Sequence, residues 1–200
     1  WTLYDVFIDN LDINQTILQS DFNFLKVIPS DINLAGLEVQ FANNPDKEFI
    51  LKNKISEIKE VFDFIIIDCP PSLGILSVNS LTASKEVIVP IQCEFYALEG
   101  LSMFFNTIQL IKTRTNPELE LLGVLLTMYD PRTNLAKQVV DEALKYFKDK
   151  VFKTIIPRNT KLGEAPSFGK PIIFYDIASK GAESYLQFAK EVMKNESATK

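Results

Sequence analysis

The chain has 200 residues, of which 46% are hydrophobic and 24% charged, a balance that excludes a disordered segment, a collagen-like fibre and a coiled coil. It contains no histidine, so a Ser-His-Asp triad, a His-ligated zinc site and a two-His iron site are excluded. With 21 basic and 26 acidic side chains its net charge is −5, and binding to nucleic acid would need a local basic patch.

Short apolar runs alternate with longer amphipathic stretches along the chain. Strand-like runs occupy residues 25–29, 64–68, 86–92, 121–128 and 153–156, and helical patterns lie near residues 48–61, 74–83, 98–114, 135–148 and 181–194. This order predicts an α/β fold with a mostly parallel, twisted sheet flanked by helices. We expect a single domain over residues 1–194, followed by a polar tail at residues 195–200.

The apolar runs and the cysteines indicate the compartment. The longest apolar runs, such as residues 64–67, have the length of a strand and are far shorter than a membrane span. The two cysteines, Cys69 and Cys93, lack the spacing of a CxxC motif and are too few for a disulfide scaffold. We therefore expect a reducing, cytoplasmic location.

One acidic residue stands at the end of an apolar run. Residues 64–67 end in Asp68, and a Cys-Pro-Pro-Ser-Leu loop leads from it to Gly74. An acid at the carboxyl end of a buried strand lies where open α/β sheets bind ligands, and its oxygens can hold Mg²⁺ beside a phosphate. A strand end followed by a rigid turn explains the same residues, so the residues alone leave both interpretations open.

Charge is unevenly distributed along the chain. Residues 1–63 carry 5 basic and 11 acidic side chains, whereas residues 145–170 carry 7 basic and 2 acidic ones. The basic stretch, joined by Arg132, could form a surface that follows DNA phosphates. For each lysine taken separately, a solvated helix face is an equally good explanation.

Five segments occur together in the order found in one known family. They are residues 62–74 (FDFIIIDCPPSLG), 90–101 (PIQCEFYALEGL), 123–130 (GVLLTMYD), 156–159 (IPRN) and 162–172 (LGEAPSFGKPI). This set resembles the ParA/Soj-type partition ATPases, within the ParA/MinD group of P-loop proteins with a deviant Walker motif. The resemblance extends over nearly the whole chain and implies a P-loop NTPase-like fold.

The resemblance also implies a nucleotide site with ATP and Mg²⁺ as cofactors. It assigns Asp68 to the Mg²⁺ shell, through water, and Gly74 to a switch that senses the γ-phosphate. Residues expected around the adenine are Thr127, Met128, Pro157, Arg158 and Asn159. Strand termination and turn chemistry explain these five residues equally well.

The phosphate loop of the family is absent from this sequence. No GxxxxGK[ST] string occurs, and the nearest candidate, residues 163–171, has one residue too many between its glycines and ends in proline. We therefore expect the chain to begin inside the domain, to lack the first strand and the phosphate loop, and to be unable to hydrolyse ATP. The missing strand would leave an apolar slot beside residues 64–67, so we expect the isolated chain to be marginal, swapped or prone to aggregate.

The resemblance implies partners as well. ATP would drive formation of a homodimer, the dimer would bind DNA without sequence preference at the nucleoid, and a ParB-like protein would trigger hydrolysis, in chromosome or plasmid partition. Four cations are the candidates for contacting DNA: Arg132, Arg158, Lys161 and Lys170. No motif that reads base edges is visible, which suits contacts to the phosphate backbone.

Two alternatives stay open at this stage. The chain could be a degenerate, non-enzymatic relative that keeps the fold and a partner surface, although the presence of Asp68, Gly74 and residues 157–159 disfavours this. A MinD-like membrane ATPase would need an amphipathic C-terminal helix rich in basic and bulky apolar residues. Residues 195–200 do not supply one, and we expect no membrane partner.

Overall fold

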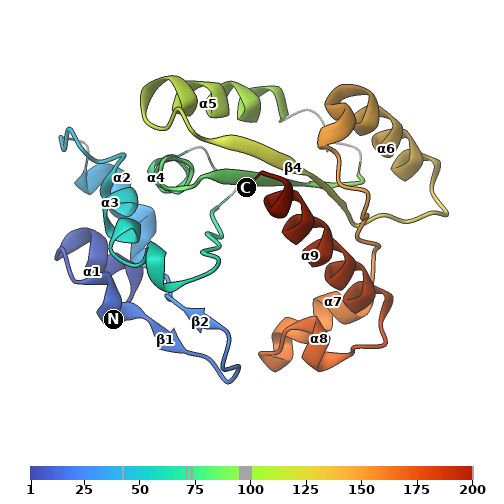
Figure 1. The fold of residues 1–200 in the computed structure, drawn as a ribbon, viewed down its shortest axis with the longest axis horizontal. Helices are drawn as coiled ribbons and strands as arrows, with labels where there is room; N and C mark the ends of the chain where they lie inside the picture. Colours follow the sequence, from blue (N-terminus) through green and yellow to red (C-terminus); the bar gives the residue numbers. More distant parts are fainter. Residues whose placement is uncertain (42, 71, 73, 95–100, 200) are drawn as a thin grey trace. The chain divides into compact units, whose positions relative to one another are not determined.

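The computed structural model describes residues 1–41, 43–70, 72, 74–94 and 101–199. Figure 1 shows the helices and strands along the chain. The chain divides into two compact units. Unit 1 comprises Trp1–Lys85 and Phe104–Glu120, and unit 2 comprises Glu86–Met103 and Leu121–Lys200. Among the described residues, no helix combines the length and the hydropathy that a membrane crossing requires. The prediction of one domain over residues 1–194 stays a prediction.

Unit 1 begins with small elements. Helix α1 (Leu3–Ile8) starts at a capping box, because the Thr2 hydroxyl accepts from the Tyr4 N–H while Asp5 accepts from the Thr2 N–H. A two-stranded antiparallel hairpin follows, and shorter helical segments flank it; their bounds are η1 (Ile13–Thr16), β1 (Leu18–Gln19), β2 (Lys26–Val27), η2 (Ile32–Gly36) and α2 (Leu37–Gln40). The strand predicted at residues 25–29 is therefore reduced to the two residues of β2.

Helices α3 (Ile50–Ser56) and α4 (Ile75–Ala83) form the centre of unit 1, and η3 (Lys59–Val61) follows α3. Phe7, Leu34, Leu37 and Leu51 form one buried hydrophobic cluster of this unit. The fully buried Asn79 of α4 joins the two helices, because its amide accepts from the Leu51 N–H at 3.1 Å and donates to the Lys47 carbonyl at 2.8 Å. An amide buried with all its partners satisfied fixes one arrangement of the helices.

Helix α5 (Leu101–Arg114) begins in unit 2 and continues into unit 1. Just beyond its end, the buried Asn116 side chain donates to the carbonyls of Leu81 and Ser84, at 2.9 and 2.6 Å. The hydroxyls of Thr82 and Thr115 lie 2.9 Å apart in the same place. These bonds fasten the end of α4 to the end of α5 within unit 1.

The strand predicted at residues 64–68 is not formed. This segment of unit 1 has no strand assignment, and among the described residues it makes no backbone hydrogen bond. The side chains of Phe64, Ile65 and Ile66 are 48%, 39% and 90% exposed. A run of apolar residues becomes a strand only when a neighbouring strand takes up its N–H and C=O groups, and the described residues supply no such neighbour.

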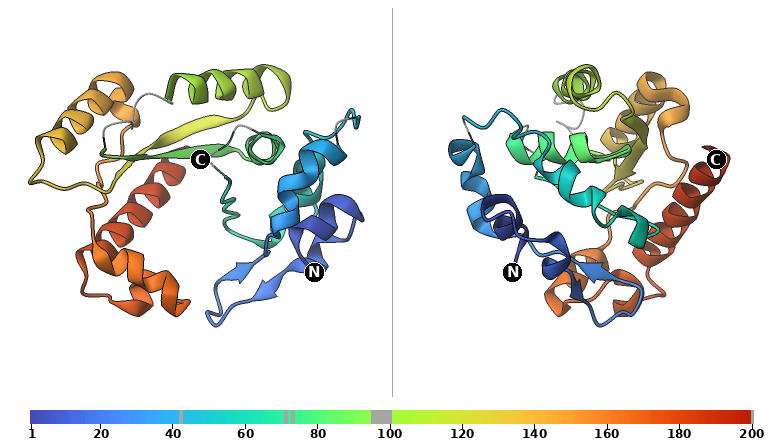
Figure 2. Two further views of the ribbon diagram at one scale, coloured as in Figure 1. Left: turned by 180° about the vertical axis from the view of Figure 1, so that it is seen from behind. Right: turned by 60° about the vertical axis from the view of Figure 1, so that its left-hand side comes forward.

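Unit 2 is built on two parallel strands, β3 (Glu86–Gln92) and β4 (Glu120–Thr127). The Glu120 N–H donates to the Lys85 carbonyl at one end of the pair, and the Cys93 N–H donates to the Thr127 carbonyl at the other. Figure 2 shows the two strands side by side from two directions. Helix α5 connects them, as a parallel pair requires. The predicted α/β class with a parallel sheet is confirmed.

The remaining helical segments of unit 2 follow β4 in the chain. They are α6 (Asn134–Phe147), η4 (Lys148–Lys150), α7 (Thr160–Glu164), η5 (Ala165–Phe168), α8 (Ile172–Tyr175) and α9 (Lys180–Thr199). Helix α9 packs Phe188 and Val192 against a buried cluster of Leu125, Phe152 and Ile156. The rings of Phe152 and Phe188 meet edge to face at 4.9 Å.

The strand predicted at residues 153–156 is not formed, and isolated parallel bridges flank the segment at Val151 and Pro157. The N–H groups of Phe152 and Ile156 donate to β4, at the carbonyls of Val124 and Leu126. Between them, the N–H groups of Lys153 and Thr154 donate to the carboxylate of Glu191 in α9, at 2.7 and 3.0 Å. The segment therefore follows β4 but is interrupted, because a side chain from α9 binds two of its backbone groups.

Candidate functional site

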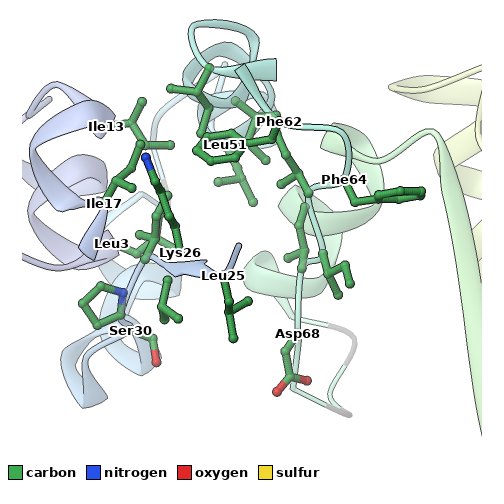
Figure 3. Close-up of a pocket in the computed structure, with 18 residues that line it drawn as sticks. Leu3, Ile13, Ile17, Leu25, Lys26, Ser30, Leu51, Phe62, Phe64 and Asp68 are labelled. Atoms are coloured by element: carbon green, nitrogen blue, oxygen red, sulfur yellow. The ribbon is translucent and has the colours of Figure 1, made fainter. Parts of the chain in front are cut away.

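Asp68, the predicted Mg²⁺ residue, is an exposed carboxylate in unit 1. It lines one end of a cavity of about 520 Å³, and Phe62 lies at the other end (Figure 3). The cavity wall is mostly apolar and comes from α1, the β1–β2 hairpin, α3 and residues 62–68. Such a wall suits apolar side chains better than a charged ligand. Asp68 is the one acidic side chain among the described residues that line the cavity. Among the described residues there is no group of three acidic or sulfur ligands.

Gly74, the predicted switch residue, is the N-cap of α4. Its φ of −82° and ψ of −171° describe extended backbone, which does not require glycine. The loop before it is held by the Ser77 hydroxyl, which donates to the carbonyls of Pro70 and Ser72. Residues 71 and 73 of the same loop lie outside the described residues.

The five residues predicted around adenine come together in unit 2. Thr127 is the last residue of β4 and Met128 follows it. The Tyr129 N–H donates to the Ile156 carbonyl, and the Arg158 N–H donates to the Tyr129 carbonyl. Pro157 thereby pairs with Tyr129, and Asn159 caps α7 by accepting from the Lys161 N–H at 2.9 Å. Met128 has a φ of 56°, a left-handed conformation that is uncommon for a residue other than glycine.

Some of these groups already have internal roles. The Thr127 hydroxyl lies 3.3 Å from the Ile91 carbonyl, to which it donates, and the Asn159 side chain is used in the cap. The structure thus brings together the residues that the motifs predicted, and strand termination accounts for part of their contacts.

The four predicted DNA-contacting cations all belong to unit 2. Arg132 binds the Asp130 carboxylate with Nε at 2.9 Å and Nη2 at 2.7 Å. This ion pair lowers the pKa of Asp130 to about 2, chiefly through the side-chain hydrogen bond and also through the Arg132 N–H that Asp130 accepts. The Arg132 side chain is 84% exposed.

The other three cations differ in their partners. Arg158 pairs with Glu94, and Lys161 pairs with Glu164 at 2.8 Å. Hydrogen bonds from Lys161 and from the Tyr175 hydroxyl lower the pKa of Glu164. Lys170 is exposed and follows Gly169, whose φ of 62° turns the backbone in a way that favours glycine.

Sequence reasoning missed the acidic partners of these cations. The two-residue spacing of Asp130 and Arg132 around Pro131 is a turn signal, and the three-residue spacing of Lys161 and Glu164 places both on one helix face. Both pairs could have been predicted. No local signal links Glu94 to Arg158, which is 64 residues away.

Comparison with known proteins shows which family the chain matches. Residues 1–121 match a family model described as an AAA domain. The sporulation initiation inhibitor protein Soj of Bacillus subtilis is 52% identical over 193 residues, which cover 96% of this chain and 76% of that protein. The chromosome partitioning protein ParA of Myxococcus xanthus is 48% identical over 195 residues, covering 98% of this chain and 69% of that protein.

A solved structure agrees with these relatives. Cobyrinic acid a,c-diamide synthase from Mycobacterium smegmatis, crystallised with ADP and magnesium, superposes with a TM-score of 0.84 at 32% identity, over 100% of this chain and 74% of that one. The fold and the motifs therefore agree over nearly the whole sequence. The chain belongs to the ParA/Soj family of partition ATPases, as its five segments predicted.

Proposed function

We propose that the chain serves in chromosome or plasmid partition through ATP-dependent dimerisation and binding to DNA without sequence preference. The observation that carries this proposal is its 52% identity to Soj over 96% of the chain. The cations Arg132, Lys161 and Lys170 of unit 2 support the DNA-binding part, because they lie at least partly exposed on a chain that is otherwise net acidic. In this proposal the ATP-bound homodimer associates with the nucleoid, and a ParB-like protein triggers hydrolysis.

The cofactors we propose are ATP and Mg²⁺. The bound ADP and magnesium in the cobyrinic acid a,c-diamide synthase structure support this choice, and the exposed Asp68 carboxylate has the hard oxygen that Mg²⁺ prefers. When bound, Mg²⁺ would neutralise phosphate charge. Asp68 would hold it through water, Gly74 would sense the γ-phosphate, and Thr127, Met128 and residues 157–159 would contact the base.

We further propose that these 200 residues do not hydrolyse ATP by themselves. The sequence contains no GxxxxGK[ST] string, so no lysine is placed by such a loop to neutralise the β- and γ-phosphates. We expect phosphate to be released from ATP no faster than in buffer without protein. Turnover that disappears in Asp68→Ala would contradict this.

The DNA-binding part is tested by salt-dependent affinity. With ATP and Mg²⁺ present, we expect the chain to bind a random-sequence duplex at low salt, and Arg132→Gln and Lys161→Gln each to weaken binding to every duplex alike. Each change should reduce the slope of log K against log salt by about one, because one phosphate contact is lost. The measurement is fluorescence anisotropy from low to physiological salt.

The matched control is Lys52→Gln, which removes the same charge from an exposed residue of α3 in unit 1. We expect it to leave the slope unchanged. Equal losses in all three variants would show that total charge, and not the unit 2 surface, governs binding. Undiminished binding in Arg132→Gln and Lys161→Gln would refute the assignment of these two residues.

A further inference from the structure

Three of the four predicted DNA-contacting cations are already bound to carboxylates of unit 2. Arg132 pairs with Asp130, Arg158 with Glu94 and Lys161 with Glu164. Within the described part of the chain, Lys170 has no ion pair. The surface expected to attract phosphates therefore carries its own competing anions.

Several hydrogen bonds hold Asp130 and Arg132 together. The carboxylate accepts three hydrogen bonds from Arg132, two from the guanidinium and one from the backbone N–H at 3.0 Å. The Asp130 side chain is only 17% exposed, whereas that of Arg132 is 84% exposed. The Asp130 carboxylate is thus held in a fixed position. It occupies the two guanidinium N–H groups, Nε and Nη2, with which Arg132 could otherwise bind a phosphate.

The Glu164 pair is held from two sides. Its Oε2 accepts from the Lys161 ammonium and from the Tyr175 hydroxyl, both at 2.8 Å. Tyr175 is in turn stacked on Phe168, with ring centroids 5.0 Å apart. To bind a phosphate, the Lys161 ammonium must break its ion pair with Glu164, whose carboxylate is also held by the Tyr175 hydroxyl.

We infer that Asp130, Glu94 and Glu164 limit the affinity of this surface for DNA by competing with phosphate groups for Arg132, Arg158 and Lys161. This inference rests on the proposed DNA-binding function. A DNA phosphate must displace the paired carboxylate before it can bind the arginine or lysine side chain. Exposed ion pairs are weak, so each carboxylate should lower DNA affinity by about two- to fivefold, and the three together tune binding without abolishing it.

The test replaces each carboxylate by its neutral isostere. Asp130→Asn, Glu94→Gln and Glu164→Gln, singly and together, are made in the full chain, which is titrated with a random-sequence duplex at low salt in the presence of ATP and Mg²⁺. Each single variant is expected to bind about two- to fivefold more tightly than the parent. The variants should keep the parent's circular dichroism, because ion pairs near the surface contribute at most about 1 kcal/mol to stability.

Two controls separate competition from a simple change in net charge. Asp141→Asn makes the same charge change at an exposed position of α6 that has no ion pair within the described residues, and it should change affinity much less. In an Arg132→Gln background, Asp130→Asn should give no gain, because the cation that it releases is absent.

Each outcome decides one question. If the chain binds DNA but the three variants gain no more than Asp141→Asn, competition is refuted and the DNA-binding proposal stands. A gain from Asp130→Asn that persists without Arg132 refutes competition in the same way. If neither the parent nor the triple variant binds DNA, the proposed DNA-binding function itself is wrong.

Discussion

At the scale of single residues, Asn79 shows how a buried side chain replaces a missing cap. Helix α3 has no side-chain cap of its own, since Phe49 occupies that position. The Leu51 N–H in the first turn of α3 is instead taken by the Asn79 carbonyl oxygen, from α4. A helix start is thus stabilised by a residue 28 positions away, which no local pattern reports.

We expect Asn79→Ala to destabilise the chain by about 1–3 kcal/mol, because it leaves a buried N–H group without this partner. Urea unfolding followed by circular dichroism measures the change. The control is Asn53→Ala, an exposed position of α3, which should alter the free energy of unfolding by less than about 0.5 kcal/mol. A similar loss in both variants would contradict the capping role.

The Asp130–Arg132 ion pair makes the free energy of unfolding depend on pH in the acidic range. Its pKa is lowered from 3.8 to about 2 by Arg132, so the folded state favours the ionised carboxylate. The stabilisation from this pair is complete above about pH 4 and is lost as the pH falls through 2. Carboxyl-carbon NMR should find the pKa near 2 in the parent and closer to 3.8 in Arg132→Gln. A parent value near 3.8 would show that the pair does not form in solution.

At the scale of elements, the outcome of each prediction depended on where the hydrogen-bonding partners lie. Strand β3 and helices α4 and α6 were predicted nearly to the residue, because apolar periodicity is a local property. Residues 64–68 carry an equally strong strand pattern. A strand also needs a second strand that bonds to its backbone groups, and the local sequence does not indicate whether one is present. Residues 153–156 were misjudged because Glu191, 38 residues beyond Lys153, binds their backbone.

The same reasoning applies to the candidate site. Residues 127–128 and 157–159 could be expected together, because strand ends meet at one edge of a parallel sheet. The carboxylate partner of Arg158 could not, because Glu94 reaches it only through the folded arrangement.

Glu191 should be the residue that holds α9 to the interrupted segment. In Glu191→Ala, the N–H groups of Lys153 and Thr154 lose their acceptor, and we expect faster hydrogen exchange at these two amides and a loss of about 1–3 kcal/mol. Lys190→Ala, at the exposed neighbouring position of α9, is the control. Unchanged protection of both amides in Glu191→Ala would refute this role.

At the scale of the whole molecule, the exposed segment at residues 64–66 governs solution behaviour. Its side chains are apolar, and within the described residues its backbone groups lack hydrogen-bond partners. An unpaired apolar segment can act as a template on which a second chain forms a strand. The expectation that the isolated chain is marginal, swapped or prone to aggregate stays a prediction.

We expect Ile66→Lys to reduce self-association, because a charge on the exposed segment opposes strand pairing between chains. Sedimentation velocity at increasing concentration measures the effect. Ile32→Lys is the matched control, since Ile32 is 88% exposed, as Ile66 is 90% exposed, but lies in η2. Equal reduction by both changes would show that surface hydrophobicity in general, and not this segment, drives association.

The contact between α9 and residues 152–154 has a consequence for synthesis on the ribosome. Glu191 is translated 38 residues after Lys153, which takes roughly 2–8 s at about 5–20 residues per second. During that interval Leu125 and Phe152 have been made, but Phe188 and Val192, which pack against them, have not. The nascent chain therefore displays an apolar surface for seconds, long enough for a chaperone at the exit tunnel to bind it before unit 2 is complete.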